Sequence, residues 1–348
     1  MAGAGPPAPS LVDIGTEVLQ WLALSVPLGV GMTIAALAMP EERGGVVAKR
    51  VRTLALPAAV LVLVTALVKV LAAGGGRGGA AHAGLLAALQ IGGLVLAGVG
   101  LVLVWRRPSR PLAGGIAIVT LLAAFVPNLP FSFTLNGLAH NLLTAAHVLG
   151  MQVWVGGLIV LALAGLLGRI RGPEAETSRA TEDWMQVWER FAIAAMCSVG
   201  VLIVSGTWLA WTHVGTVGQL FTTPYGRHLA LKLVLVLALV LAGAYNMRVL
   251  IPKIAAARRQ GEDRSTFRLA VEHFPAVVLG EAVVGFAILV VVPFLRGSAR
   301  TEADWPGARP FDLTVLGSGI ALVALVAFAL WAGTRTPVAG AEKPVRTD

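Results

Sequence analysis

The sequence predicts an all-α protein, a polytopic bundle of about nine transmembrane helices with its N-terminus outside the membrane and its C-terminus inside. Three observations lead to this fold class. Hydrophobic residues make up 57% of the 348 residues and charged residues only 13%, about half the charged share of a soluble domain. The apolar residues gather in runs long enough to cross a bilayer. The basic residues alternate between the two sides that these runs would separate.

The apolar runs set the expected helices, because a membrane-crossing helix needs about 20 mostly apolar residues. They lie near Glu17–Met39, Arg52–Ala73, His82–Trp105, Leu112–Val126, Thr134–Gly168, Phe191–His213, Tyr225–Ile251, Glu272–Phe294 and Asp312–Ala332. The fourth run is short and bounded by prolines. The fifth is too long for the bilayer alone, so part of it should lie in water or in the interface.

The basic residues predict the orientation. The loops after spans one, three, five and seven, together with the C-terminal tail, carry 20 Lys and Arg residues, and the opposite side carries five. Cytoplasmic loops are the basic ones, so the C-terminus is expected inside. No Lys or Arg precedes Arg43, which favours a retained first span over a secretory signal. The net charge of +9 is then explained by these loops, and we expect the lipid bilayer as a partner and no nucleic acid.

One connection has a distinct composition. Gly172–Asp183 is polar and indicates a solvated inner loop. Trp184 and Trp188, which follow it, suit an interfacial segment.

The histidines point to a possible chemistry. The predicted topology places five of the six near the outer face: His82, His140, His147, His213 and His228. Four of them lie about 20 to 24 residues from an inner arginine of the same helix, or roughly 30–36 Å at the α-helical rise. His273 is expected on the inner side.

The fifth span carries the sharpest pattern. His140, His147, Met151 and Trp154 follow one another at intervals of seven, four and three residues, which puts them on one helical face. Imidazole and thioether together suit copper, because the soft sulfur favours Cu(I). We therefore expect metal ligation by His140, His147 and Met151, joined by His213 or His228. The alternative is that these histidines bind headgroups and water, and that Met151 and Trp154 are packing residues.

A carboxylate lies within the eighth span. An ionised Glu281 would be costly in the membrane interior. A proton-linked role, an ion pair with Lys232 and a protonated carboxyl bonded to a neighbour all remain open. The sequence contains no Walker loop and no recognisable catalytic triad, so we expect no enzymatic activity.

At the fifth span the sequence AHVLGMQVWVGGL resembles the His-x6-Trp-x-Gly-Gly signature of the copper resistance protein D family. The resemblance continues through SGTWLAW, through a Tyr-Gly-x5-Lys segment with a following Asn, and into FRLAVE. It covers roughly His140 to Pro293. The positions that it matches are His147, Trp154, Gly156, Gly157, Tyr225, Gly226, Lys232 and Asn246.

This resemblance implies a multi-pass protein of the bacterial plasma (inner) membrane that acts in copper import or copper resistance. Copper would be captured at the outer His/Met site, and a periplasmic or extracytoplasmic copper chaperone is an expected partner. The expected support or translocation path takes Trp154, Tyr225, Lys232 and Asn246 from the resemblance, and Glu281, which departs from the family pattern, from its position within the eighth span.

The same reasoning divides the chain. Residues 1–16 are expected to form a mobile outer tail and 17–133 a four-span membrane region. The copper resistance D-like membrane domain would occupy 134–296. The last outer loop and ninth span would follow at 297–334, and a cytoplasmic tail at 335–348.

Two other functions remain open. Histidines on two helices would suit the axial ligands of haem in a membrane electron carrier. A non-transporting scaffold that delivers copper for oxidase assembly would need the same outer site as an importer.

Overall fold

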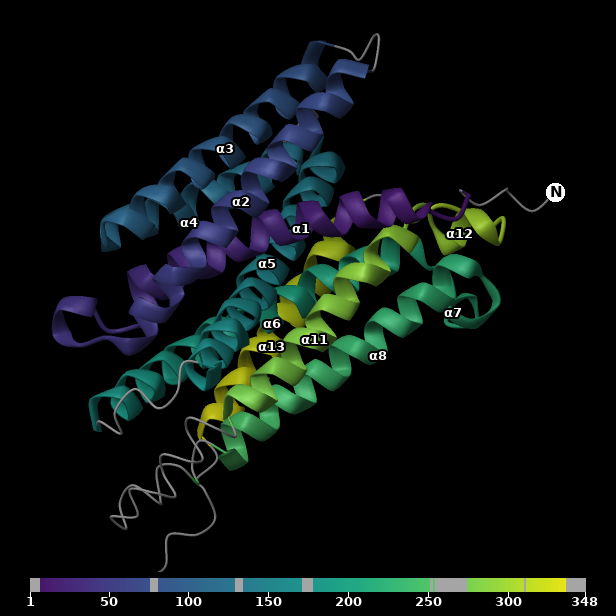
Figure 1. Ribbon diagram of the computed structural model, residues 1–348. Coiled ribbons are helices and arrows are strands. Elements are labelled where there is room, and N and C mark those ends of the chain that lie inside the picture. Colours follow the sequence, from purple (N-terminus) through teal and green to yellow (C-terminus); the bar gives the residue numbers. More distant parts are fainter. Residues whose placement is uncertain are drawn as a thin grey trace, which may run out of the picture.

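The computed structural model describes residues 7–75, 81–128, 134–170, 178–250, 253, 274–309 and 311–335. These residues form an all-α bundle and contain no strand, which confirms the predicted fold class. The long helices run alongside one another, and α1 crosses the others obliquely (Figure 1). His273 and the FRLAVE segment lie outside the described residues.

Each predicted span corresponds to a helix. The long helices are α1 (Leu11–Met32), α2 (Val46–Gly75), α3 (Ala81–Arg106), α4 (Arg110–Phe125), α5 (Leu135–Ile170), α6 (Ser178–His213), α8 (Pro224–Tyr245), α11 (Phe274–Val291) and α13 (Leu313–Arg335). The π-helices η1 (Thr33–Leu37) and η4 (Asn246–Leu250) continue α1 and α8, and the 3-10 helix η6 (Val292–Phe294) continues α11. The short helices α7 (Gln219–Thr222) and α12 (Ala299–Glu302) lie in the connections.

The lengths agree with the sequence prediction. Among the described residues, eight helices are long and apolar enough to cross a membrane, and α4 is a shorter apolar helix. Its 16 residues reach only about 24 Å, less than the roughly 30 Å of a hydrocarbon core. The 36 residues of α5 reach about 54 Å, so this helix must project beyond the core, as predicted.

Local capping explains where several helices begin. The Ser10 hydroxyl accepts from the Asp13 N–H, while the Asp13 carboxylate accepts from the Ser10 N–H. This reciprocal capping box starts α1 six residues before the first predicted span. Thr223 caps α8 in a similar way, because its Oγ1 accepts from the Gly226 N–H at 3.0 Å.

The prediction of a solvated loop over Gly172–Asp183 was wrong for the part that the structure describes. The α6 helix already begins at Ser178, and Asp183 is 0% exposed. Trp184 is 1% exposed and stacks on Trp188 at 5.2 Å between ring centroids. The carboxylate of Asp183 accepts hydrogen bonds from the backbone N–H groups of Met39 and Val47, each at 2.8 Å. Distant backbone donors thus compensate the burial of this carboxylate, and the polar composition did not indicate solvent.

The centre of the bundle is the crossing of α1 and α5. These helices are the most buried of the candidate spans, whereas α8 and α13 leave most of their surface free for lipid. A Cβ atom added at Gly29 would collide with the Gly156 carbonyl, and one added at Gly156 would collide with the Ser25 carbonyl. Gly157 meets the Phe191 ring of α6 in the same way. Small residues therefore allow close helix approach here.

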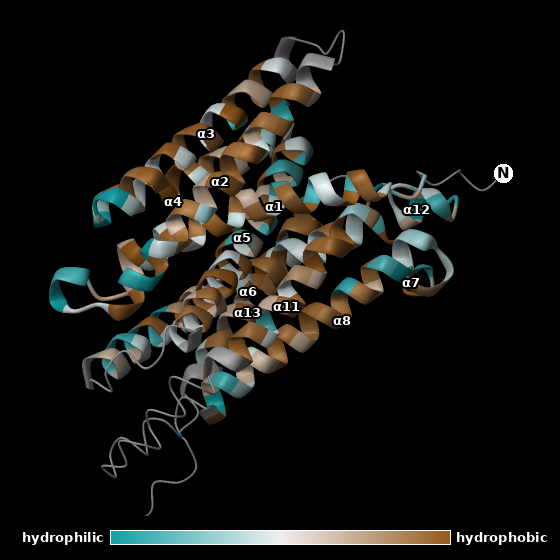
Figure 2. Cartoon of the chain, viewed as in Figure 1, coloured by the Kyte–Doolittle hydropathy of each residue, from teal (hydrophilic) through white to brown (hydrophobic). Residues whose placement is uncertain are grey.

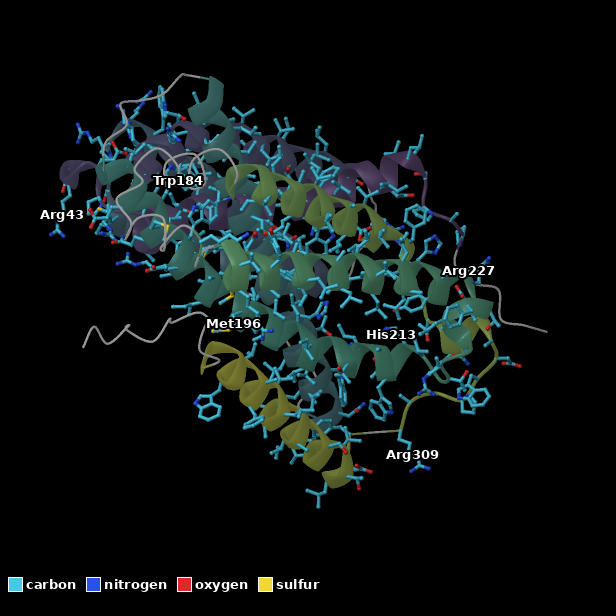
Figure 3. The ribbon with its side chains drawn as sticks, turned by 90° about the horizontal axis from the view of Figure 1, so that it is seen from below. Arg43, Trp184, Met196, His213, Arg227 and Arg309 are labelled. Carbon is cyan, nitrogen blue, oxygen red and sulfur yellow. The ribbon has the colours of Figure 1, made fainter. Side chains whose placement is uncertain are left out.

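The two ends of the bundle differ. Figure 3 shows Arg43 and Trp184 toward one end and His213 and Arg227 toward the other. Hydrophobic residues occupy the middle of the helices, and hydrophilic ones collect near the ends (Figure 2). The histidines of α6 and α8 thus lie at the end opposite the basic first loop. The assignment of that end to the outside stays a prediction from the basic residues.

Candidate functional site

His147 joins α5 to α6. Its Nδ1 lies 3.1 Å from the Oγ of Ser205, and that hydroxyl donates to the Val201 carbonyl at 2.6 Å. A serine hydroxyl has one hydrogen to donate, so Ser205 accepts from His147 and the imidazole carries its proton on Nδ1. The Nε2 lone pair is then available to a metal ion. Gly206 leaves room for this contact, because a Cβ there would lie 3.3 Å from the His147 ring.

His213 is the last residue of α6. Its Nδ1 lies 2.8 Å from the Leu209 carbonyl oxygen, and its ring stacks on Tyr225 with centroids 5.8 Å apart. A carbonyl oxygen only accepts, so Nδ1 carries the proton here as well. The free Nε2 has the same ligand character as that of His147.

His228, in the first turns of α8, follows the same pattern. Its Nδ1 lies 2.8 Å from the Pro224 carbonyl oxygen, and its ring stacks on Phe294 at 4.8 Å. Three predicted ligands therefore have Nδ1 occupied by a protein acceptor. Such bonds commonly orient metal-binding histidines.

The segment after α11 covers the ends of α6 and α8. The Ser298 hydroxyl donates to the His213 carbonyl at 2.9 Å, and Arg300 donates to the Trp211 carbonyl at 2.9 Å. Glu302 accepts from the Tyr225 N–H at 2.9 Å. These contacts fix both members of the His213–Tyr225 stack, and sequence spacing gave no indication of them.

The predicted ligands form a series along the helices. His140 is exposed and lies seven residues before His147, about 10 Å along α5. His213 lies eight residues beyond Ser205 on α6, about 12 Å in the same direction. Met151 is half-buried and lies one turn beyond His147 along α5, farther from His140.

This series is open. Among the described residues, no three His, Cys, Asp or Glu side chains come together around one metal position. A metal ion bound at any one position of this series would therefore have few protein ligands.

The predicted support residues take different positions. Trp154 is buried in the hydrophobic core, and Tyr225 is buried next to the segment after α11, where its N–H donates to Glu302. Lys232 on α8 is partly buried.

Asn246 and Glu281 form a direct pair. The Asn246 Nδ2 donates to Glu281 Oε1 at 2.6 Å. The ion pairs found among the described residues, Arg52–Glu41 and Arg296–Glu17, do not involve Glu281. Of the sequence alternatives, the structure therefore forms a bond to a neutral neighbour and no ion pair with Lys232.

Sequence reasoning missed a group of polar side chains at the α1–α5 crossing. Gln152 is 0% exposed, and neither its Oε1 nor its Nε2 has a hydrogen-bond partner among the described residues. The same holds for Trp21 Nε1 and Ser25 Oγ. Gln152 lies one turn before Gly156, and Trp21 one turn before Ser25, which touches Gly156. A glutamine inside an apolar run was the available signal.

Part of the chain matches a known protein family. Residues 185–295 match the family model of copper resistance protein D. This match confirms the resemblance for a segment that runs from α6 through η6 and includes Tyr225, Lys232 and Asn246. The matched segment begins after α5, so the signature around His147 lies outside it. No curated protein and no solved structure matches the chain.

The copper resistance protein D segment contains the His213–Tyr225 stack, the His228–Phe294 stack and the Asn246–Glu281 pair. Together with the eight apolar helices, the match supports a copper-related, multi-pass membrane protein. The family is a membrane copper-resistance family and not a known enzyme family.

Proposed function

We propose that this protein captures copper at the outer face of the bacterial plasma membrane and passes it inward, in copper import or copper resistance. The observation that carries the proposal is the His147–Ser205 hydrogen bond. This bond orients the half-buried imidazole of His147 near the expected outer end of α5 and leaves its Nε2 free. Met151 lies one helical turn farther into the bundle. Copper is the cargo here.

The ligands form a graded path. His140 and His213 lie nearest the rim, His147 lies below them, and Met151 follows. Imidazole accepts Cu(II) or Cu(I), whereas the thioether of Met151 favours Cu(I). An open series suits transport, because each level binds with few ligands and releases the ion to the next. A closed tetrahedral cage would suit a structural metal instead.

The expected outer end of the bundle also suits the delivery of copper. His140 is exposed at the beginning of α5, where an extracytoplasmic copper chaperone would reach it directly. Tyr225 supports the position of His213 at this end, because the two rings stack.

The haem alternative finds less support in this arrangement. A haem held by two histidines needs their rings to face each other across the iron. His147 faces Ser205, His213 faces Tyr225, and His228 faces Phe294.

The copper content of purified protein after copper exposure tests the proposal. We expect wild type to retain copper and the His140→Ala/His147→Ala double variant to lose most of it. His82→Ala is the matched control, because His82 lies on α3, which packs on α2 and α4 and away from this site. Equal copper in wild type and the double variant would contradict the α5 site.

Transport is tested in sealed vesicles. Copper accumulation that depends on His147 would support import. A copper-loaded protein that moves no copper would support the scaffold for oxidase assembly instead.

A further inference from the structure

A second polar site lies deep in the bundle, away from the histidines. Glu281 precedes Phe294 by 13 residues on α11 and η6, which places it about 20 Å from the His228–Phe294 stack. It packs at the contact of α11 with α8, where Asn246 begins η4. Glu281 is 7% exposed and Asn246 is 5% exposed. The pair is therefore buried within two apolar spans.

The hydrogen bonds of this pair are incomplete for an ionised carboxylate. Asn246 donates through Nδ2 to Glu281 Oε1 at 2.6 Å, but the Asn246 Oδ1 is buried and has no donor among the described residues. An ionised carboxylate only accepts, whereas a protonated one adds an O–H donor. A buried acceptor without a donor is costly. A proton on Glu281 would supply an O–H donor for the Asn246 Oδ1.

The surrounding charges do not offer Glu281 a counter-ion. α11 packs on α5, α8, α1 and η6. The titratable or charged groups on these helices and on η4 are His140, His147, Arg169, Tyr225, Arg227, His228, Lys232, Tyr245, Arg248, Asp13 and Glu17. Where the structure describes these side chains, it shows none of them hydrogen-bonded or ion-paired to Glu281. An ionised carboxylate without such a partner is expensive inside a membrane.

The backbone at Asn246 is also unusual. The α-helix α8 passes into the π-helix η4 at this residue, and the Asn246 N–H is shared between the Ala242 and Gly243 carbonyls. π-Turns within helices occur frequently at functional sites. Here the turn coincides with the residue that bonds the carboxyl.

We propose that Glu281 and Asn246 form an intramembrane proton-binding site, in which the Glu281 carboxyl is protonated at neutral pH and donates to Asn246 Oδ1. The ligand is a proton. The proposal is independent of copper binding, because it concerns groups that bond to each other and not to the histidines.

Infrared spectroscopy of the copper-free protein in lipid tests this site. At about pH 7, where an ordinary glutamate is ionised, wild type should show a protonated-carboxyl C=O band that shifts in D2O. Glu281→Gln should lose this band. Glu42→Gln should keep it, because Glu42 is exposed in the first loop. Asn246→Leu should shift the band, because it removes the amide partner.

Two results would overturn the proposal. One is the same carboxyl region in wild type and Glu281→Gln. The other is a band that Asn246→Leu leaves unshifted, and this comparison serves even where Glu281→Gln does not fold. Neither result depends on copper content, so this proposal and the copper proposal fail separately.

Discussion

His147 donates from Nδ1 to the hydroxyl of Ser205, 3.1 Å away on the neighbouring helix. The hydroxyl in turn donates to the Val201 carbonyl, so the imidazole tautomer is set by α6 although the ring belongs to α5. One hydrogen bond thus joins the α5 face that carries the predicted ligands to the helix in which the copper resistance protein D match begins. The site depends on the packing of these two helices.

Replacing Ser205 tests that dependence. Ser205→Ala removes the acceptor of the His147 N–H and leaves the ring free to turn or change tautomer. Loss of such an orienting partner typically costs 10- to 100-fold in metal affinity, and we expect a loss in this range in a copper competition titration. Thr207→Val is the control, because among the described residues the Thr207 hydroxyl bonds the Ile203 carbonyl of its own helix. Unchanged affinity in Ser205→Ala would remove His147 from the copper site.

Lys232 should weaken copper binding at His147. Lys232 lies one turn beyond His228 on α8, and a positive charge on its amine would oppose a copper cation bound nearby. Lys232→Met should therefore raise copper affinity by roughly threefold to tenfold, an electrostatic effect of about 1 kcal/mol. Lys232→Arg keeps the charge and should bind as wild type does. A lower affinity in Lys232→Met, measured by the same titration, would instead make Lys232 a supporting residue.

The α1–α5 crossing should not tolerate a side chain at Gly156. The added Cβ of Gly156→Ala meets the Ser25 carbonyl, which is backbone and can move only if the helices separate. Overpacking of this kind costs about 1–3 kcal/mol, and thermal unfolding in detergent should show a lower Tm. Gly92→Ala is the control, because a Cβ at Gly92 meets no atom of the described residues within 4 Å. Equal midpoints for the two variants would argue against this close crossing.

Asp183 should be important for the stability of the end of the bundle that carries the basic first loop. Asp183→Ala leaves the N–H groups of Met39 and Val47 without their acceptor. Hydrogen bonds to a charged group contribute about 1.5–3 kcal/mol each, so we expect a marked drop in thermal stability. Glu182→Ala removes an exposed neighbouring carboxylate and should leave the Tm nearly unchanged. A similar small effect in both variants would show that the Asp183 bonds contribute little.

The helices themselves were predictable, because the ability to cross a membrane is a local property. Each of the nine apolar runs in the sequence became a helix, and the short fourth run became the short α4. Hydrocarbon leaves backbone groups no partner outside their own helix, so apolar composition over about 20 residues specifies both the structure and its length. The same local reasoning identified Glu281 as a carboxyl within a span.

The partners of the polar residues were not predictable, because they come from distant parts of the chain. Asp183 lies 144 and 136 residues from the two N–H groups that it binds. Ser205 is 58 residues from His147, and Asn246 is 35 residues from Glu281. Hydropathy predicts which residues lie in the membrane, but it does not predict which helices contact one another. Side-chain packing decides those contacts, and glycines such as Gly156 decide how closely the helices approach.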